Sequence, residues 1–213
     1  MRIKPILSLL VAGLMILSCI KHEVIPAPVP TVALKSKFTG TVIIGTSSAV
    51  AFNEGVDGYT CVSPNLKNTS PYTEIFYSKI YSTTNPATAP SVKIGFGTLS
   101  TAGDPTVDEF NAFFTSNTSP PYASFIPPNV LNGFEVSYTT ATGTNYISVP
   151  TQTGQNVSFS SIVQESDASG DYSKFVCQFN CKLVYDLVST PPTNAADDTM
   201  QITNGYFKGW FQR

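Results

Sequence analysis

The clearest alternation of apolar and polar positions in the chain spans residues 172–187, YSKFVCQFNCKLVYDL. Apolar side chains occupy every second position from Phe175 to Leu187, and polar side chains such as Lys174 and Gln178 fall between them. In a strand, side chains with a period of two lie on one face and those between them lie on the other, whereas a helix would scatter them around its circumference. The segment is therefore predicted to be a long strand with one buried face.

Shorter segments repeat this pattern along the chain. They are rich in β-branched and aromatic residues, are bounded by turn-forming residues, and cover residues 37–45, 73–82, 91–99 and 157–165. In the last of them, Val157, Phe159 and Val163 are spaced for one face of a strand. Residues 134–149, FEVSYTTATGTNYISV, alternate in the same way around Gly143 and are predicted to form a β-hairpin.

One segment, GDPTVDEFNAFFTSN, has helical periodicity instead. Asp104 is expected to cap the helix and Pro105 to occupy its first position, because proline tolerates the first turn. Apolar residues then recur at helical spacing at Val107, Phe110, Phe113 and Phe114. The pattern predicts one short helix over about residues 105–115.

Strands separated by turn signals, with a single short helix, predict an all-β fold. We expect an antiparallel two-layer β-sandwich in which the helix covers one open end or flank of the sheet layers. An open barrel is the alternative.

The N-terminus predicts an export signal and a lipid anchor. Arg2 and Lys4 precede a nearly unbroken apolar run that is short for a membrane span, which needs about 20 apolar residues. The run ends in Ile16-Leu17-Ser18-Cys19, which is similar to a lipobox, the site where a cysteine is acylated and becomes the first residue. An ordinary cleaved signal with an incidental cysteine is the alternative.

These features divide the chain into three parts. Residues 1–18 are predicted to be a lipoprotein signal peptide, and residues 19–37 a lipidated cysteine with a proline-rich tether. Residues 38–213 are predicted to form a single β-sandwich domain. Acyl chains such as palmitate on Cys19 would hold the protein to the outer membrane, facing either the cell surface or the periplasm.

The charge balance excludes two classes of partner. Without Arg2 and Lys4, ten basic side chains face fourteen acidic ones, a net charge of −4. No basic stripe is visible along the sequence, so neither nucleic acid nor an anionic membrane surface is expected as an electrostatic partner.

The chain offers little for catalysis. Its only histidine, His22, lies in the tether, which excludes histidine-dependent hydrolases and histidine-ligated zinc enzymes. The acidic residues Glu54, Asp57, Glu135 and Asp186 are interpreted as solvated strand or loop residues. A non-enzymatic protein without catalytic residues is therefore expected.

Three cysteines remain after lipidation of Cys19. Cys177 and Cys181 lie four positions apart on one predicted strand, about 13 Å, which is too far for a disulfide. Burial of Cys61, Cys177 and Cys181 as small apolar residues is the favoured interpretation. A disulfide from Cys61 to Cys177 or to Cys181 is the alternative, because an exported protein meets an oxidising environment.

Two further groups of residues are binding candidates. Glu165, Asp167 and Asp171 surround a small-residue turn and could supply oxygen ligands for Ca²⁺, although a plain polar turn is favoured. No other cofactor is expected. Near the C-terminus, alternation places Tyr206 and Trp210 on the outward face of a strand, where their rings could bind a sugar, although packing at an edge under a loop is favoured.

The C-terminal half carries EFNAFF, GFEVSYTTATGTNY, QTGQNVSFSSI, FVCQFNCKLVY and ITNGYFKGWF, in that order. In these motifs the chain resembles a group of uncharacterised small lipoproteins of Bacteroidota, and the resemblance implies an envelope lipoprotein of β-sandwich type. The expected function is a non-enzymatic module that binds a glycan or a protein. The alternatives are an accessory subunit docking on an outer-membrane complex and a carboxylate-dependent glycan hydrolase.

Overall fold

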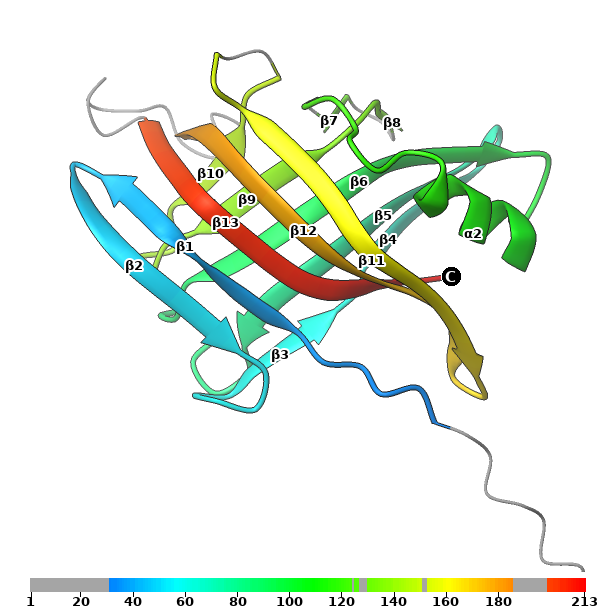
Figure 1. Cartoon of the computed structure of the whole chain (residues 1–213), viewed down its shortest axis with the longest axis horizontal. Coiled ribbons are helices and arrows are strands. Elements are labelled where there is room, and N and C mark those ends of the chain that lie inside the picture. The colour runs from blue at the N-terminus through cyan, green and yellow to red at the C-terminus, as the bar shows by residue number, and fades with distance from the viewer. Residues whose placement is uncertain (1–30, 124, 127–129, 151–152, 186–198) are drawn as a thin grey trace, which may run out of the picture. The chain divides into compact units, whose positions relative to one another are not determined.

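The computed structural model describes residues 31–123, 125–126, 130–150, 153–185 and 199–213 (Figure 1). Residues 31–213 belong to one compact unit. Its elements follow one another as β1 (Lys37–Ile44), β2 (Thr46–Asn53), β3 (Tyr59–Val62), β4 (Asn65–Thr69), β5 (Tyr72–Ser82), β6 (Ser91–Thr101), α2 (Val107–Thr115), β7 (Phe125–Ile126), β8 (Val130–Leu131), β9 (Glu135–Thr139), β10 (Asn145–Ser148), β11 (Asn156–Asp167), β12 (Gly170–Tyr185) and β13 (Thr199–Gln212).

A single antiparallel sheet supplies both layers of the fold. Its strand order is β2–β1–β13–β12–β10–β9–β6–β5–β3, with β11 paired to β12 and β4 paired to β5. In Figure 1, β2, β1, β13, β12 and β11 lie in front and cross over β9, β6, β5 and β4 behind them. The predicted all-β sandwich with one short helix is confirmed.

The strand β12 links the two layers because it has different partners at its two ends. From Gly170 to Asn180 it pairs with β11, and from Leu183 to Tyr185 it pairs with β10. On its other side it pairs with β13, which in turn pairs with β1. The first and last strands of the domain are therefore neighbours in the front layer.

The predicted buried face of β12 is confirmed from Phe175 to Leu183, whereas Tyr185 at the end of the strand is half-buried. Alternate residues Phe175, Cys177, Phe179, Cys181 and Leu183 are buried at 5% exposure or less, while residues between them face solvent or are half-buried. Leu187 and Asp186, which the sequence pattern also assigned to this strand, lie outside the described residues.

The core between the layers is dominated by phenylalanine. The helix α2 supplies Phe114, whose ring centroid lies 4.7 Å from Phe211 on β13, 4.8 Å from Phe96 on β6 and 5.3 Å from Phe76 on β5. The rings of Phe114 and Phe211 are stacked, whereas Phe76 meets Phe114 edge-on. Through these rings α2 joins both layers at one end of the sandwich.

The helix begins later than the sequence indicated. Its N-cap is Thr106, whose hydroxyl accepts the backbone N–H of Glu109 while the Glu109 carboxylate accepts the backbone N–H of Thr106. This reciprocal pair satisfies two backbone donors at once and lowers the pKa of Glu109. Asp104, the expected cap, instead accepts a hydrogen bond from the Tyr72 hydroxyl.

The hairpin of β9 and β10 is confirmed, but the face expected to be solvated is not. Phe134, Val136 and Tyr138 are buried as expected. Glu135 and Ser137, on the other face, are only 3% and 7% exposed. The expectation of a solvated Glu135 is therefore wrong.

A bulge in β11 overturns the predicted shared face of Val157, Phe159 and Val163. Phe159 is buried opposite Cys177, whereas Val163 is 44% exposed opposite Lys174. Between them Ser161 has a φ of 52°, and the register shifts there. An extra residue reverses the alternation of all side chains that follow it.

Candidate functional site

The candidate site is a hollow of about 400 Å³ on the outer surface of β11, β12 and β13. We call it the asparagine groove. The residues that line it are Asn156, Val157, Ser158, Gln178, Phe179, Asn180, Asn204, Gly205 and Tyr206. Phe179 and Gly205 are buried, and most of the other lining side chains are exposed or half-buried.

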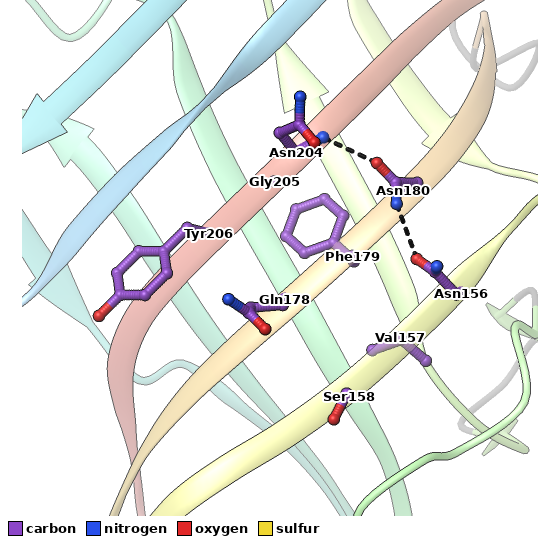
Figure 2. Close-up of a pocket in the computed structure, with 9 residues that line it drawn as sticks. All are labelled: Asn156, Val157, Ser158, Gln178, Phe179, Asn180, Asn204, Gly205 and Tyr206. Atoms are coloured by element: carbon purple, nitrogen blue, oxygen red, sulfur yellow. Dashed lines mark hydrogen bonds between the residues drawn. The ribbon is translucent and has the colours of Figure 1, made fainter.

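Three asparagines form a row across the strands. The Asn180 side-chain amide donates to the Asn156 side-chain oxygen at 2.9 Å, and the Asn180 oxygen accepts the backbone N–H of Asn204 at 2.7 Å. Figure 2 shows this row, with Tyr206, Gln178 and Ser158 in the next row across the same strands. Each amide has spare donors or acceptors for a ligand after these bonds.

The backbone of β13 bulges at the groove. Asn204 has a φ of 52°, and the pairing of β13 shifts register here with both β1 and β12. Asparagine tolerates this left-handed conformation better than most residues. The bulge re-aims the strand so that Met200, Ile202 and Phe207 all remain buried although their spacing is irregular.

A second hollow adjoins the groove and shares Asn156 and Val157 with it. This hollow holds about 710 Å³ and is bounded by Pro121 and Tyr122. The Tyr122 hydroxyl is placed to donate a hydrogen bond to the backbone carbonyl oxygen of Asn156, at 3.2 Å, and to that of Asn180, at 3.1 Å. Tyr122 thereby fixes the spacing of two strands beneath the asparagine row.

The chemical character of the groove is neutral and polar. Its lining includes amides, a serine hydroxyl and the Tyr206 ring, but no charged side chain. Amides can donate and accept at once, and a tyrosine ring offers apolar area beside a polar tip. Such a set matches a ligand that carries many hydroxyl groups on a partly apolar frame.

Of the two predicted platform residues, only Tyr206 lies in this groove. Trp210 is 9% exposed, its ring meets Tyr172 edge-on at 5.6 Å, and its indole Nε1 has no hydrogen-bond partner among the described residues. The expectation of an outward Tyr206–Trp210 pair is therefore wrong for Trp210. Local alternation indicated its face, but the burial of that face at this end of β13 depends on tertiary packing.

The three acids proposed for Ca²⁺ are held by separate protein groups. Glu165 binds the Lys174 ammonium at 2.5 Å, and Asp171 binds the Arg213 guanidinium at 2.6 Å. Asp167 accepts the backbone N–H groups of Val32 and Ser169. In the described part of the chain, no three acidic, histidine or cysteine side chains gather into a group that could hold a metal ion.

The cysteines Cys61, Cys177 and Cys181 are buried free thiols. The alternative disulfide from Cys61 to Cys177 or Cys181 is not formed in the structure. Burial raises the pKa of Cys61 to about 11 and raises the pKa of Cys177 and Cys181 as well. A protonated, inaccessible thiol is a poor nucleophile, so all three act as small apolar residues.

A buried acid that the sequence analysis missed is Glu74 on β5. Its side chain is fully buried, contacts the Lys67 ammonium at 3.3 Å and accepts a hydrogen bond from Asn65 at 2.9 Å. Burial raises its pKa, although Lys67 opposes the shift. Glu54, in contrast, accepts the backbone N–H of Ser36 at 2.7 Å.

Several predicted features lie outside the described residues. They are the lipidation site Cys19, the tether histidine His22 and the acidic residue Asp186. Within the described residues, no helix is both long enough and apolar enough to span a bilayer.

The asparagine row was missed because its members are far apart in the sequence. Asn156, Asn180 and Asn204 recur at intervals of 24 residues. Asn156 and Asn180 lie at nearly equal distances from the turn between β11 and β12, which is a signal that could have placed these two opposite each other.

Comparison of the chain with models of protein families, with curated proteins and with solved structures finds no match.

Proposed function

We propose that this protein is a lipid-anchored envelope protein of the kind suggested by its resemblance to Bacteroidota lipoproteins, and that it binds a glycan in the asparagine groove. The observation that carries the proposal is the row of Asn156, Asn180 and Asn204 beside Tyr206, without a charged side chain in the lining. Sugar hydroxyls pair with amides, and the apolar face of a sugar ring packs against an aromatic ring. The activity is binding without catalysis.

Exposed apolar side chains support ligand capture over docking onto a membrane complex. Among the described residues, the large hydrophobic side chains that are most exposed are Val56, Leu66, Val107 and Val163. They belong to the turn before β3, to β4 in the rear layer, to α2 and to β11 in the front layer, so they are spread over both layers and the helix. A docking face would gather such residues into one patch.

The proposed anchor is Cys19, with the signal peptide removed before it and the proline-rich tether after it. Replacement of Cys19 by alanine is expected to move the protein from the outer-membrane fraction to the soluble fraction, because acyl chains on this residue hold it in the bilayer. Fractionation of producing cells followed by blotting measures this shift. A Ser18→Ala variant, which keeps a small residue before the cysteine, should stay in the membrane.

Membrane association that survives the Cys19→Ala change would contradict the lipid anchor. Protease shaving of intact cells, with a periplasmic protein as lysis control, then decides the orientation. Digestion of the protein while the control survives places the domain at the cell surface, and protection of both places it in the periplasm.

Replacement of Tyr206 by alanine is expected to weaken glycan binding about tenfold, because the aromatic contact and its polar tip are lost together. Binding is measured by screening the full chain, purified in nonionic detergent, on an array of neutral and acidic glycans, followed by calorimetry on the best ligand. Asn180→Ala should weaken binding too, because it breaks the asparagine row.

The matched control is Tyr81→Ala, which removes a half-buried tyrosine from β5, away from the groove. This variant should bind as the unmodified chain does. Equal affinity of the Tyr206→Ala and Asn180→Ala variants and the unmodified chain, for every glycan that binds, would refute the groove as the site.

A further inference from the structure

A third hollow, different from the one bounded by Pro121 and Tyr122, lies beside the asparagine groove and shares Tyr206 with it. It holds about 360 Å³ on the outer surface of β11, β12 and β13, with residues 33 and 35 also lining it. Three lysines line this hollow: Lys35 before β1, Lys174 on β12 and Lys208 on β13. We call it the lysine hollow.

The charge of the lysine hollow is not balanced by the described acidic residues. Lys174 is neutralised by Glu165, with 2.5 Å between the Nζ atom and the carboxylate. Lys35 and Lys208 are exposed and form no ion pair with an acidic side chain in the described part of the chain. The Glu54 carboxylate accepts hydrogen bonds from the backbone N–H and the hydroxyl of Ser36 and forms no ion pair with a lysine among the described residues.

Pairing of β1 with β13 adds a third unbalanced lysine to Lys35 and Lys208. Lys37 on β1 is directly opposite Lys208 on β13, and both side chains are exposed. Like charges directly opposite each other on neighbouring strands are destabilising. Lys35 lies two positions before Lys37 in extended chain, which places it towards the same face. An anion over these lysines would offset their mutual repulsion.

We infer that the ligand of the proposed site is an acidic glycan, with a neutral sugar unit in the asparagine groove and an adjacent carboxylate or sulfate group over Lys208 and Lys35. The inference rests on the proposed glycan-binding function and specifies its ligand class. Tyr206 lines both hollows and would contact the junction between the two units.

A lipid surface fits these observations less well than a glycan. Recognition of anionic lipid typically takes a cluster of four to eight basic residues, whereas three unbalanced lysines are present here. The lysines are also joined through Tyr206 to a neutral amide groove, which a layer of headgroups would not need. The whole arrangement suits an extended chain with one neutral and one charged part.

The test compares two glycans with the same backbone. Calorimetry with the full chain in nonionic detergent measures binding of oligogalacturonate and of its fully methyl-esterified, neutral form; sulfated and desulfated galactan fragments form a second pair. We expect the unmodified chain to bind the anionic member of at least one pair about tenfold more tightly, as a charge-assisted contact would provide. Added salt should reduce this preference.

Variants separate charge from structure. Lys208→Gln is expected to weaken binding of the anionic glycan by most of the tenfold difference and so to abolish most of the preference. Lys208→Arg should retain the preference. Lys79→Gln on β5 in the rear layer removes the same charge at a residue that lines neither hollow, and should change neither the affinity nor the preference.

Each outcome has a definite meaning. Equal binding of neutral and anionic glycans would overturn the acidic-ligand inference and leave the proposed function standing. Absence of binding to any glycan would overturn both. Cosedimentation of the Cys19→Ala chain with phosphatidylglycerol vesicles but not with phosphatidylcholine vesicles, lost in Lys208→Gln and without any glycan preference, would assign the lysines to a membrane surface and overturn the inference.

Discussion

Replacement of Phe211 by alanine is expected to lower the free energy of unfolding by about 4 kcal/mol, the middle of the range for a buried phenylalanine. Phe211 is fully buried and its ring centroid lies 4.5 Å from Phe175 and 4.7 Å from Phe114. It therefore joins α2 to the front layer, with Phe96 of the rear layer at 5.7 Å. Neighbours on three elements limit how far the site can collapse after truncation.

Equilibrium unfolding in urea, followed by tryptophan fluorescence and circular dichroism, measures this loss. Val163→Ala is the control, because Val163 is 44% exposed on β11 and its truncation should change stability by no more than about 0.5 kcal/mol. A loss below about 1 kcal/mol for Phe211→Ala would contradict the packing of α2 between the layers.

Replacement of Gly205 by alanine is expected to cost about 2 kcal/mol of stability and to weaken glycan binding in the same variant. An added Cβ would lie 2.8 Å from the Phe179 ring and 2.9 Å from the Phe179 backbone oxygen. Because the second of these is backbone, β12 and β13 must move apart. That movement would displace Asn180 and Asn204, which the asparagine row holds together.

Gly103→Ala is the matched control for Gly205→Ala, since nothing lies within 4 Å of a Cβ added at position 103. Thermal unfolding and calorimetry on both variants measure stability and affinity together. Unchanged stability in Gly205→Ala would contradict the close approach of the two strands. If Gly205→Ala lost stability but kept its affinity for the glycan, the bulge in β13 would not be part of the binding site.

Local periodicity was sufficient to predict the main elements. The alternation in β12, the hairpin around Gly143 and the short helix are all present, because a buried face imposes its period on the sequence. The predicted cap of the helix was wrong: Thr106 and Glu109 have the spacing of a capping box and form it, while Asp104 accepts a hydrogen bond from Tyr72.

Bulges and tertiary packing account for what the sequence pattern missed. The bulge at Ser161 places Val163 on the outer face, and no local composition marks that extra residue. Glu135 and Trp210 occupy faces that alternation assigns to solvent, but other parts of the chain cover them. Burial of an outward face is decided by elements distant in sequence, so period alone cannot show it.

The candidate site was predicted only in part for the same reason. Tyr206 was recognised as a binding residue by its type and face, but its partners come from β11 and β12. The lysine hollow was invisible, because Lys35, Lys174 and Lys208 come from three segments and no basic stripe appears in the sequence. Charge counted along the chain is a poor guide to charge gathered across strands.

The pairing of the first strand with the last has a consequence for biogenesis. Lys37 meets Lys208, a partner 171 positions later in the chain, and β13 is also the partner of β12. A polypeptide is synthesised from its N-terminus, so β1 can pair with β2 early but must wait for nearly the whole chain before it can pair with β13. Contacts of such long range make folding slow. The front layer is thus completed only after β13 has been synthesised, and until then β1 has β2 as its strand partner.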